Sequence, residues 1–301
     1  MRGERAAAVR EMAARLGVAA DAVRPAAFQG VAGEVHLLGA DLVLKVARTG
    51  FAADLRKEAL VVPHAVAAGV RTPEVVEFGA GGPPFGAPYL VLRRAPGVAV
   101  AEPGPRARRE LGRELALLHA APVPPEVRAG VPADPVGDPG PGVERLVAEG
   151  WLSADLARWL LGWLGALAAL APPFDAPVLI HGDVSAANLL VDPGPDGRLV
   201  ALLDWGDAAL TEPAVEFAKV PMRALPEVLD GYLEGRGESG AAAWAARALW
   251  HHVVWAVGAV ARGPEPEARH WSAQPVNRLL ELVRACAEGL PEGWQALRPP
   301  R

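Results

Sequence analysis

The first 96 residues combine short apolar runs with one longer periodic segment. Apolar, β-branched runs bounded by turn-forming residues are typical of strands. Four such runs occur here, at residues 26–38, 41–47, 75–79 and 88–93. Residues 51–69 carry apolar side chains at steps of three and four, which predicts a helix that ends at Gly69. Strands that enclose a single helix indicate an antiparallel sheet carrying a helix.

Beyond the break at Pro96 and Gly97 the pattern becomes helical. Residues 105–120 place leucines on one face and charged side chains on the other, which predicts a helix. Residues 143–170 predict one helix, or two helices split near Gly150. Between these segments, residues 122–142 hold seven Pro and four Gly, which predicts a loop without regular packing.

Two short apolar runs, residues 188–192 and 199–203, flank the turn-forming segment PGPDG and predict a β-hairpin. If the turn centres near Pro195, residue 188 faces about residue 202. Asn188 and Asp204 then meet at the open end of the hairpin, while His181 and Asp183 lie on the loop before it. Two carboxylates, an amide oxygen and an imidazole therefore converge in one small region.

Composition narrows the classes of protein that fit. The chain has 301 residues, of which 51% are hydrophobic and 22% charged, so it can bury a core. The net charge of -5 excludes a strongly basic nucleic-acid binder. The charge is uneven, because residues 1–96 carry 12 Lys and Arg against 9 Asp and Glu, whereas residues 97–301 carry 18 against 26.

Neither a membrane span nor a disulfide framework is expected. The longest uncharged apolar stretches, residues 159–174 and 248–261, fall short of the ~20 residues that cross a bilayer. The first 18 residues predict a charged amphipathic helix rather than a signal peptide. The single cysteine, Cys286, excludes a multi-cysteine metal site and is expected to be a buried, inert thiol. We therefore expect a cytoplasmic monomer or homodimer without nucleic-acid or membrane partners.

The residues at the hairpin suit one kind of metal. Amide and carboxylate oxygens favour a hard cation such as Mg²⁺ over zinc. Mg²⁺ usually takes one or two protein carboxylates and completes its shell with phosphate oxygens and water, which predicts a nucleotide. Asp183, five residues before Asn188, is free to receive or orient a proton.

These motifs resemble a known family. HGDxxxxN, beginning at His181, followed by LDWGD is similar to the aminoglycoside phosphotransferase family, a bacterial branch of the protein-kinase-like fold. VLKVA and LRKEA resemble its ATP-binding strand and the helix that pairs with it, while YLVLRRAPG and LGRELALLHA resemble its hinge and the helix that follows. The resemblance implies a two-lobed α+β fold. Residues 1–94 would form a nucleotide-binding lobe on a small antiparallel sheet, and residues 95–301 a larger, mainly helical catalytic lobe.

The resemblance also implies a role for each matching position. Asp183 would be the catalytic base, and His181 would support its loop. Asn188 and Asp204 would hold Mg²⁺ between the phosphates of ATP or GTP. The remaining positions would bind the nucleotide: Lys45 and its partner Glu58 at the phosphates, Gly30 and Gly33 in the loop over them, and the backbone of Arg93 to Ala95 at the purine.

Lysine usage supports one of these roles independently. Only three of the 30 basic residues are lysines, namely Lys45, Lys57 and Lys219. A lysine inside an apolar strand is therefore an unusual choice for this chain, and a phosphate contact in a tight space favours a compact ammonium.

The sequence departs from the family pattern at several positions. The phosphate-covering loop, residues 28–33, has two glycines instead of G-x-G-x-x-G, so a plain hairpin turn explains it almost as well. Glu212 and Glu216 stand where the family usually has Asp, which puts their structural roles in doubt. Asp207 fits a metal or substrate contact and a turn carboxylate equally well. The absence of a long activation segment after Asp204 favours a small-molecule acceptor.

Several acceptors fit this pattern. The acidic balance of residues 97–301 favours a cationic aminoglycoside, and so antibiotic inactivation and resistance. All nine tryptophans follow residue 150, which keeps a macrolide, or a metabolite such as a sugar or an amino alcohol, as alternatives, because these side chains line either the core or a substrate cleft. A nucleotide-binding pseudokinase is the least favoured. A metal-dependent phosphoesterase leaves Lys45 and Glu58 unexplained.

Overall fold

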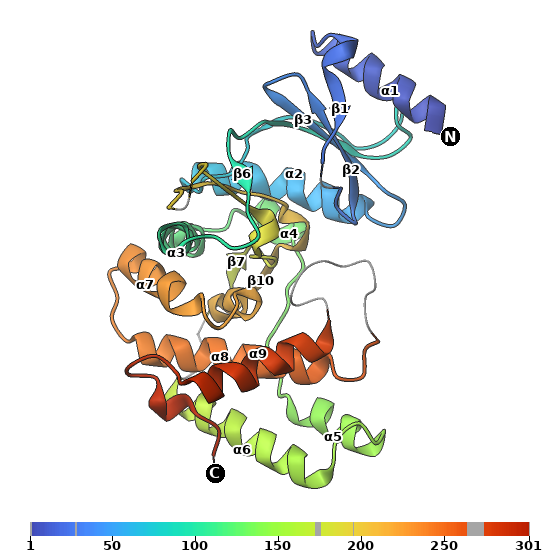
Figure 1. The fold of residues 1–301 in the computed structure, drawn as a ribbon. Helices are drawn as coiled ribbons and strands as arrows, with labels where there is room; N and C mark the ends of the chain where they lie inside the picture. Colours follow the sequence, from blue (N-terminus) through green and yellow to red (C-terminus); the bar gives the residue numbers. More distant parts are fainter. Residues whose placement is uncertain (1, 28, 172–175, 195, 264–273, 301) are drawn as a thin grey trace.

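A computed structural model describes residues 2–27, 29–171, 176–194, 196–263 and 274–300 (Figure 1). Its N-terminal part contains an antiparallel sheet with the order β1-β2-β3-β5-β4 among the described residues. The strands are β1 (Val23–Pro25), β2 (Gly33–Leu38), β3 (Leu42–Ala47), β4 (Val75–Gly79) and β5 (Tyr89–Arg93). Helix α1 (Arg2–Arg15) covers one face of this sheet and helix α2 (Ala52–Ala67) the other. The predicted sheet carrying a helix is confirmed.

The alternation of side chains along β3 decides which way Lys45 points. Leu44 and Val46 are fully buried in a cluster with Met12 of α1. Successive side chains on a strand point to opposite faces, so Lys45 projects to the face of the sheet that packs on α2. Ala47 lies on that face too, in a cluster with Leu55 of α2.

Residues 26–38 do not form one strand. Strand β1 ends at Pro25, and β2 begins only at Gly33, where it pairs with Ala47. The side chain of Gln29 crosses the intervening loop, since its Nε2 donates to the Ala26 and Val35 carbonyls at 3.0 and 2.8 Å and its Oε1 accepts from the Val35 amide. The Gln29 side chain takes backbone hydrogen bonds that a neighbouring strand would otherwise make, which keeps this loop out of the sheet. Phe28, in the same loop, lies outside the described residues.

The rest of the chain is mainly helical and contains two small sheets in the described residues. The helices are α3 (Pro105–Ala120), α4 (Pro125–Gly130), α5 (Gly140–Ala148), α6 (Ala154–Leu170), α7 (Leu225–Arg236), α8 (Ala241–Gly258) and α9 (Pro275–Glu288). The strands are β6 (Val98–Ala99), β7 (Val178–Ile180), β8 (Leu189–Val191), β9 (Leu199–Leu202) and β10 (Ala209–Thr211). Among the described residues, no helix has both the length and the apolar character that a membrane span needs.

The predicted helix over residues 105–120 is confirmed as α3, and the split near Gly150 separates α5 from α6. The prediction of an unpacked loop over residues 122–142 was wrong in part. Residues 125–130 form α4, and its Val127 is buried. The prolines permit this helix because proline is tolerated in the first turn, where its missing N–H has no partner to lose.

The predicted hairpin is present, with a register one residue away from the expected one. Strand β8 pairs with β9 through Leu189 opposite Leu202, whereas residue 188 was expected opposite about residue 202. Asn188 still lies at the open end, because its carbonyl accepts from the amide of Leu203 at 2.8 Å. Pro195, the expected centre of the turn, lies outside the described residues.

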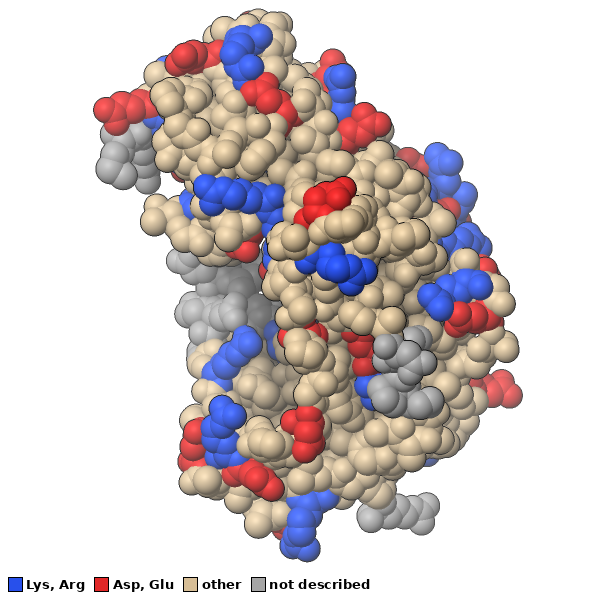
Figure 2. Space-filling model, turned by 180° about the vertical axis from the view of Figure 1, so that it is seen from behind, with Lys and Arg blue, Asp and Glu red and all other residues tan. Residues whose placement is uncertain are grey.

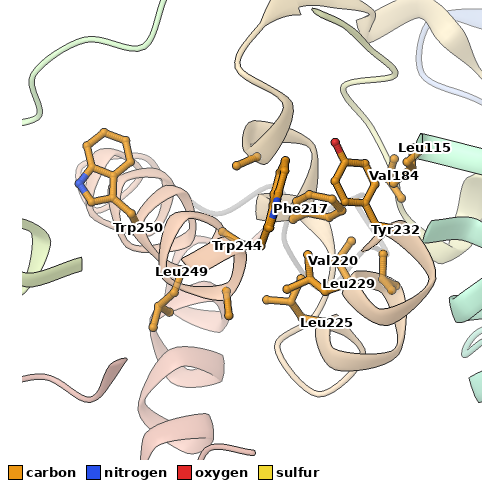
Figure 3. Packing of buried hydrophobic residues seen from close by; sticks show 14 of the residues in the cluster. Leu115, Val184, Phe217, Val220, Leu225, Leu229, Tyr232, Trp244, Leu249 and Trp250 are labelled. Atoms are coloured by element: carbon orange, nitrogen blue, oxygen red, sulfur yellow. The ribbon is translucent and has the colours of Figure 1, made fainter. Parts of the chain in front are cut away.

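An aromatic core lies beneath the segment that follows the hairpin. The rings of Phe217 and Tyr232 meet edge to face with centroids 5.1 Å apart, and those of Tyr232 and Trp244 at 4.8 Å. Figure 3 shows these three rings side by side, with Trp250 on the far side of α8. Trp163, Trp244 and Trp250 are therefore core residues, whereas Trp151 is 53% exposed.

Three side chains of this helical part differ in burial. His251 and His252 on α8 are buried. Cys286 on α9 was expected to be buried and is only half-buried. Its partial burial raises the pKa of the thiol.

Candidate active site

Lys45 and Glu58 form a buried ion pair between β3 and α2. The Lys45 Nζ lies 2.6 Å from Oε2 and 2.8 Å from Oε1 of Glu58, and Glu58 is only 3% exposed. Burial works against the charge of Lys45, yet the Glu58 and Asp204 carboxylates outweigh it and raise the pKa of the ammonium. Lys45 therefore stays charged at neutral pH, with its position fixed by Glu58.

Asp204 comes from the other part of the chain to the same ammonium. Its Oδ1 lies 3.0 Å from the Lys45 Nζ, and its side chain is 42% exposed. Its backbone has a φ of 67°, a left-handed conformation that a non-glycine residue adopts only where its surroundings fix it. The next residue supplies this constraint, because Trp205 is fully buried and donates through Nε1 to Thr72 Oγ1 at 2.9 Å.

Glu216 holds the loop of His181, Gly182 and Asp183 in place through backbone hydrogen bonds. This buried carboxylate accepts the backbone amides of His181 at 2.6 Å and of Gly182 at 2.9 Å. His181 also donates through Nε2 to the Leu203 carbonyl at 3.0 Å, which ties the loop to the strand that leads to Asp204. Gly182 has a φ of 82°, and a Cβ there would lie 2.2 Å from the Asp207 carbonyl oxygen. Glycine is therefore required at this point of the loop.

The Asp183 carboxylate has a partner on each oxygen. Lys219 Nζ lies 2.8 Å from Oδ1, and Asn188 Nδ2 donates to Oδ2 at 2.8 Å. Partial burial alone would raise the pKa of Asp183, but the Lys219 ammonium and the Asn188 amide outweigh it and keep the pKa below its ordinary value. Asp183 is therefore an ionised acceptor at neutral pH.

The residues present fit a Mg²⁺ ion that is shared with phosphates. The Asn188 amide nitrogen uses both of its hydrogens on Asp183, one on Oδ2 and one on the backbone carbonyl at 2.9 Å. Its Oδ1 is thus left to bind a cation. The backbone of Asn188 is also bonded to Leu203, the residue before Asp204, so the two side chains lie close together. The described residues hold no group of three or more His, Cys, Asp and Glu able to bind a metal on their own. One amide and one carboxylate match a cation that takes most of its ligands from a nucleotide and water.

The structure thus brings six predicted site residues together: Lys45, Glu58, His181, Asp183, Asn188 and Asp204. The other predictions stay predictions. Gly30 lies in the loop before β2, and Gly33 is its first residue. The Arg93 amide donates to the Glu74 carbonyl at 2.8 Å inside the sheet, whereas the amide of Ala95 has no hydrogen-bond partner among the described residues.

Comparison with known proteins places the chain in a family. A sequence model of the phosphotransferase enzyme family matches residues 28–250. The chain belongs to this family. This stretch of the phosphotransferase fold includes every residue of the candidate site, and the family predicted from HGDxxxxN and LDWGD is confirmed.

Two phosphotransferases of known name are similar in sequence. An aminoglycoside 3'-phosphotransferase from Streptomyces fradiae is 35% identical over 162 residues, which are 50% of this chain and 57% of that protein. The chain therefore matches less than two thirds of that enzyme's length. A viomycin phosphotransferase from Streptomyces vinaceus is 29% identical over 210 residues, which are 62% of this chain and 70% of that protein.

A solved structure confirms the predicted fold class. The GDP complex of an aminoglycoside 2'-phosphotransferase superposes with a TM-score of 0.67 at 20% identity, covering 93% of this chain and 96% of that one. At this identity the likeness concerns the fold alone. The family member described here therefore has the protein-kinase-like α+β fold, with a small antiparallel sheet beside a larger helical part.

The sequence did not indicate Lys219 as the partner of Asp183, and it left the structural roles of Glu212 and Glu216 in doubt. Lys219 contacts Asp183, and the scarcity of lysine that drew attention to Lys45 was a signal for it as well. Glu216 bonds the loop of His181, Gly182 and Asp183. Glu212, also buried, forms a two-armed ion pair with Arg247 of α8. Both glutamates therefore have defined structural roles.

The surface of the protein is hollowed on one side between the sheet-containing part and the helical part (Figure 2). Basic and acidic side chains are interspersed on the face that this figure shows, without a field of one sign. Asp207 is 61% exposed on its side chain and lies 3.6 Å from the Lys219 Nζ. Its expected metal contact and its expected turn position both remain predictions.

Proposed function

We propose that the chain is a Mg²⁺-dependent phosphotransferase that moves the γ-phosphoryl group of ATP or GTP to a hydroxyl group of a small molecule. The observation that carries the proposal is the continuous set of contacts from Glu58 through Lys45 to Asp204, beside Asn188 and Asp183. A charged lysine, a carboxylate beside it and a separate ionised carboxylate are the groups that phosphoryl transfer needs. Residues 1–94 would then be the nucleotide-binding lobe, and residues 95–301 the catalytic lobe.

On the donor side, Lys45 would neutralise charge on the α- and β-phosphates, with Glu58 keeping the ammonium in place. Asn188 Oδ1 and Asp204 would hold Mg²⁺, which supplies charge neutralisation of the phosphates when bound. The amide of Ala95, the first backbone donor after β5 without a partner in the described residues, would meet the purine.

On the acceptor side, Asp183 would accept a hydrogen bond from the substrate hydroxyl and take its proton. The lowered pKa of Asp183 keeps it ionised at neutral pH. Glu216 contributes by fixing the two peptide groups that precede Asp183, so the carboxylate does not reorganise during the reaction. Catalysis would then consist of positioning and charge neutralisation.

The acceptor that we favour is an aminoglycoside, whose inactivation would confer antibiotic resistance. The names of the two relatives, which give aminoglycosides and viomycin, support an antibiotic. The mixed charge in Figure 2 weakens the argument from net charge. The half-buried Trp255 lies near Asp183, with its ring centroid 5.8 Å from the Lys219 Nζ, and keeps a less polar acceptor such as a macrolide as the alternative. The Arg278 guanidinium packs on the same ring, 3.1 Å from its centroid, so the ring is not wholly open to an acceptor.

An isosteric substitution of the base tests the proposal. Asp183→Asn should lower kcat by about 10²–10⁴, the usual contribution of a positioned general base. Binding of Mg-ATP, measured by calorimetry, should change little. Asp192→Asn is the matched control, because Asp192 pairs with Arg198 at the hairpin and not with the site. Turnover would be followed as nucleoside diphosphate release with aminoglycosides, macrolides and simple sugars, with ATP and GTP in parallel.

Three results would count against parts of this proposal. Unchanged turnover in Asp183→Asn would refute the assignment of the base. Stimulation of turnover by macrolides or sugars alone would refute the aminoglycoside acceptor. A wild-type protein that binds Mg-ATP without transferring phosphate to any acceptor would indicate the pseudokinase alternative.

A further inference from the structure

Lys219 is the one lysine near Asp183 among the described residues, and its surroundings differ from those of a surface lysine. It ends the 3₁₀ segment η4 (Pro213–Lys219), and its side chain is 26% exposed. The ammonium lies 2.8 Å from Asp183 Oδ1 and 3.6 Å from Asp207 Oδ2. The flat face of Trp255 lies 5.8 Å away. The ammonium therefore borders the space that an acceptor hydroxyl must enter to reach Asp183.

Composition makes this lysine informative. Twenty-seven of the 30 basic residues are arginines, so arginine is the default cation of this chain. Two of its three lysines place Nζ within 3.0 Å of a site carboxylate, Lys45 at Asp204 and Lys219 at Asp183. Arginine would pair with a carboxylate at least as well, through its two-pronged geometry. A lysine in its place indicates a need for a compact ammonium on a flexible stem.

A purely structural role explains Lys219 poorly. The ion pair with Asp183 is only partly buried, since the two side chains are 26% and 31% exposed. The loop also has other anchors, since Glu216 bonds the peptide groups before Asp183, and Asn188 bonds its Oδ2. The loop therefore does not depend on Lys219 for its conformation.

Reaction geometry points to a ligand for Lys219. A hydroxyl that gives its proton to Asp183 lies within hydrogen-bond distance of that carboxylate, and the phosphorus it attacks lies a further ~3–3.5 Å away. An ammonium 2.8 Å from the same carboxylate can then reach the oxygens of that phosphoryl group. Lys45 contacts Asp204 and is tied to Glu58 of α2, so it addresses the donor side instead.

We propose that Lys219 is a cationic ligand of the phosphoryl group during its transfer and leaves Asp183 Oδ1 as the acceptor hydroxyl arrives. This inference rests on the proposed function. The acceptor oxygen forms the new bond to the γ-phosphorus, and the bond from that phosphorus to the bridging oxygen breaks. The electron pair leaves with the nucleoside diphosphate, and the hydroxyl proton passes to Asp183. Lys219 remains protonated throughout and donates to the equatorial oxygens, where negative charge resides.

The test compares Lys219→Met and Lys219→Arg with Lys57→Met, a control at the third lysine, which lies on α2 outside the site. Aluminium fluoride bound beside ADP imitates the transferring phosphoryl group, so it reports on this contact without an acceptor. We expect Lys219→Met to bind Mg-ADP as the wild type does and to lose at least tenfold of the tightening that aluminium fluoride adds. Its kcat should fall by about 10²–10³, the usual cost of removing one donor to transition-state charge, with the KM for nucleotide within about threefold.

The arginine variant separates this role from a structural one. Lys219→Arg keeps the ion pair with Asp183, so it should restore the thermal unfolding temperature in either case and recover kcat only in part. Full recovery of kcat by Lys219→Arg would overturn the inference. Unchanged tightening by aluminium fluoride in Lys219→Met, or no tightening in the wild type, would also overturn it. Fluoride tightening in a wild type that phosphorylates no acceptor would instead refute the proposed function alone.

Discussion

Glu216 offers the sharpest test of how the loop of His181, Gly182 and Asp183 is supported. The substitution Glu216→Gln preserves the shape of the side chain and removes one of its two acceptor oxygens. In the wild type these oxygens accept the amides of His181 and Gly182 at 2.6 and 2.9 Å, and Glu216 itself is only 2% exposed. The glutamine would aim its NH₂ group at one of those amides and leave a buried donor without an acceptor.

The magnitude follows from the contacts that are lost. A hydrogen bond to a charged acceptor contributes about 1.5–3 kcal/mol, and an orphaned buried donor costs about 1–3 kcal/mol. We therefore expect Glu216→Gln to lower the free energy of unfolding by about 3 kcal/mol, measured by urea denaturation. Transfer activity should fall as well, because Asp183 directly follows the freed peptide group. The exposed Glu292 provides the control Glu292→Gln.

Glu216→Asp separates charge from reach. The aspartate keeps both acceptor oxygens but is shorter by one methylene, so we expect it to bond one of the two amides well and to lie between the wild type and Glu216→Gln in stability. A loss below about 1 kcal/mol in Glu216→Gln, together with unchanged turnover, would refute the view that this carboxylate supports the loop.

Three further predictions concern the loop, the second buried glutamate and the metal. Gly182→Ala should reduce turnover by at least tenfold at saturating nucleotide, because its Cβ would clash with the Asp207 carbonyl oxygen; normal kinetics would contradict this. The pKa of Glu212 is lowered to about 2, since its bonds to Arg247 and His251 outweigh burial. This group stabilises the fold above pH ~4.5, and about 3 kcal/mol is lost as the pH falls towards 2. Urea unfolding from pH 5 to 3 should therefore show a shallower decline in Glu212→Gln, and equal slopes would exclude the effect. Chelation by EDTA should abolish phosphate transfer and leave the unfolding temperature nearly unchanged, because the two proposed metal ligands, Asn188 and Asp204, would need nucleotide to complete the site; a large fall in that temperature would indicate a structural metal.

Local pattern predicted the site well because its parts lie close along the chain. Asn188 and Asp204 flank one hairpin, so pairing arithmetic brings them together without knowledge of the rest of the fold. The arithmetic missed by one residue because the ladder shifts between Leu190 and Val191, a backbone irregularity that side-chain alternation does not reveal. The predicted proximity of Asn188 and Asp204 still holds, because both residues lie at the open end of the hairpin.

What the sequence did not reveal depends on contacts between distant segments. Lys219 reaches Asp183 across 36 positions, through the docking of η4. The Arg247 partner of Glu212 comes from α8, so periodicity near Glu212 carries no sign of it. Residues 125–130 escaped prediction for a different reason. The prolines and glycines around them are typical of loops, whereas the structure shows a helix with backbone bonds such as Arg128 N–H to the Pro124 carbonyl at 2.9 Å.

Because the chain has few lysines, reagents that modify primary amines would label it at few positions. Apart from the chain terminus, its side chains present three primary amines. Two of them, Lys45 and Lys219, contact carboxylates of the candidate site, Asp204 and Asp183. An acylating reagent would therefore modify few peptides, with Lys57 as an internal reference. Lys45 should react slowly, because its ammonium is held in the buried pair with Glu58. Protection of the more exposed Lys219 by acceptor would be measured by mass spectrometry, so occupancy of the acceptor side could be followed in the unmodified sequence, without engineered labels.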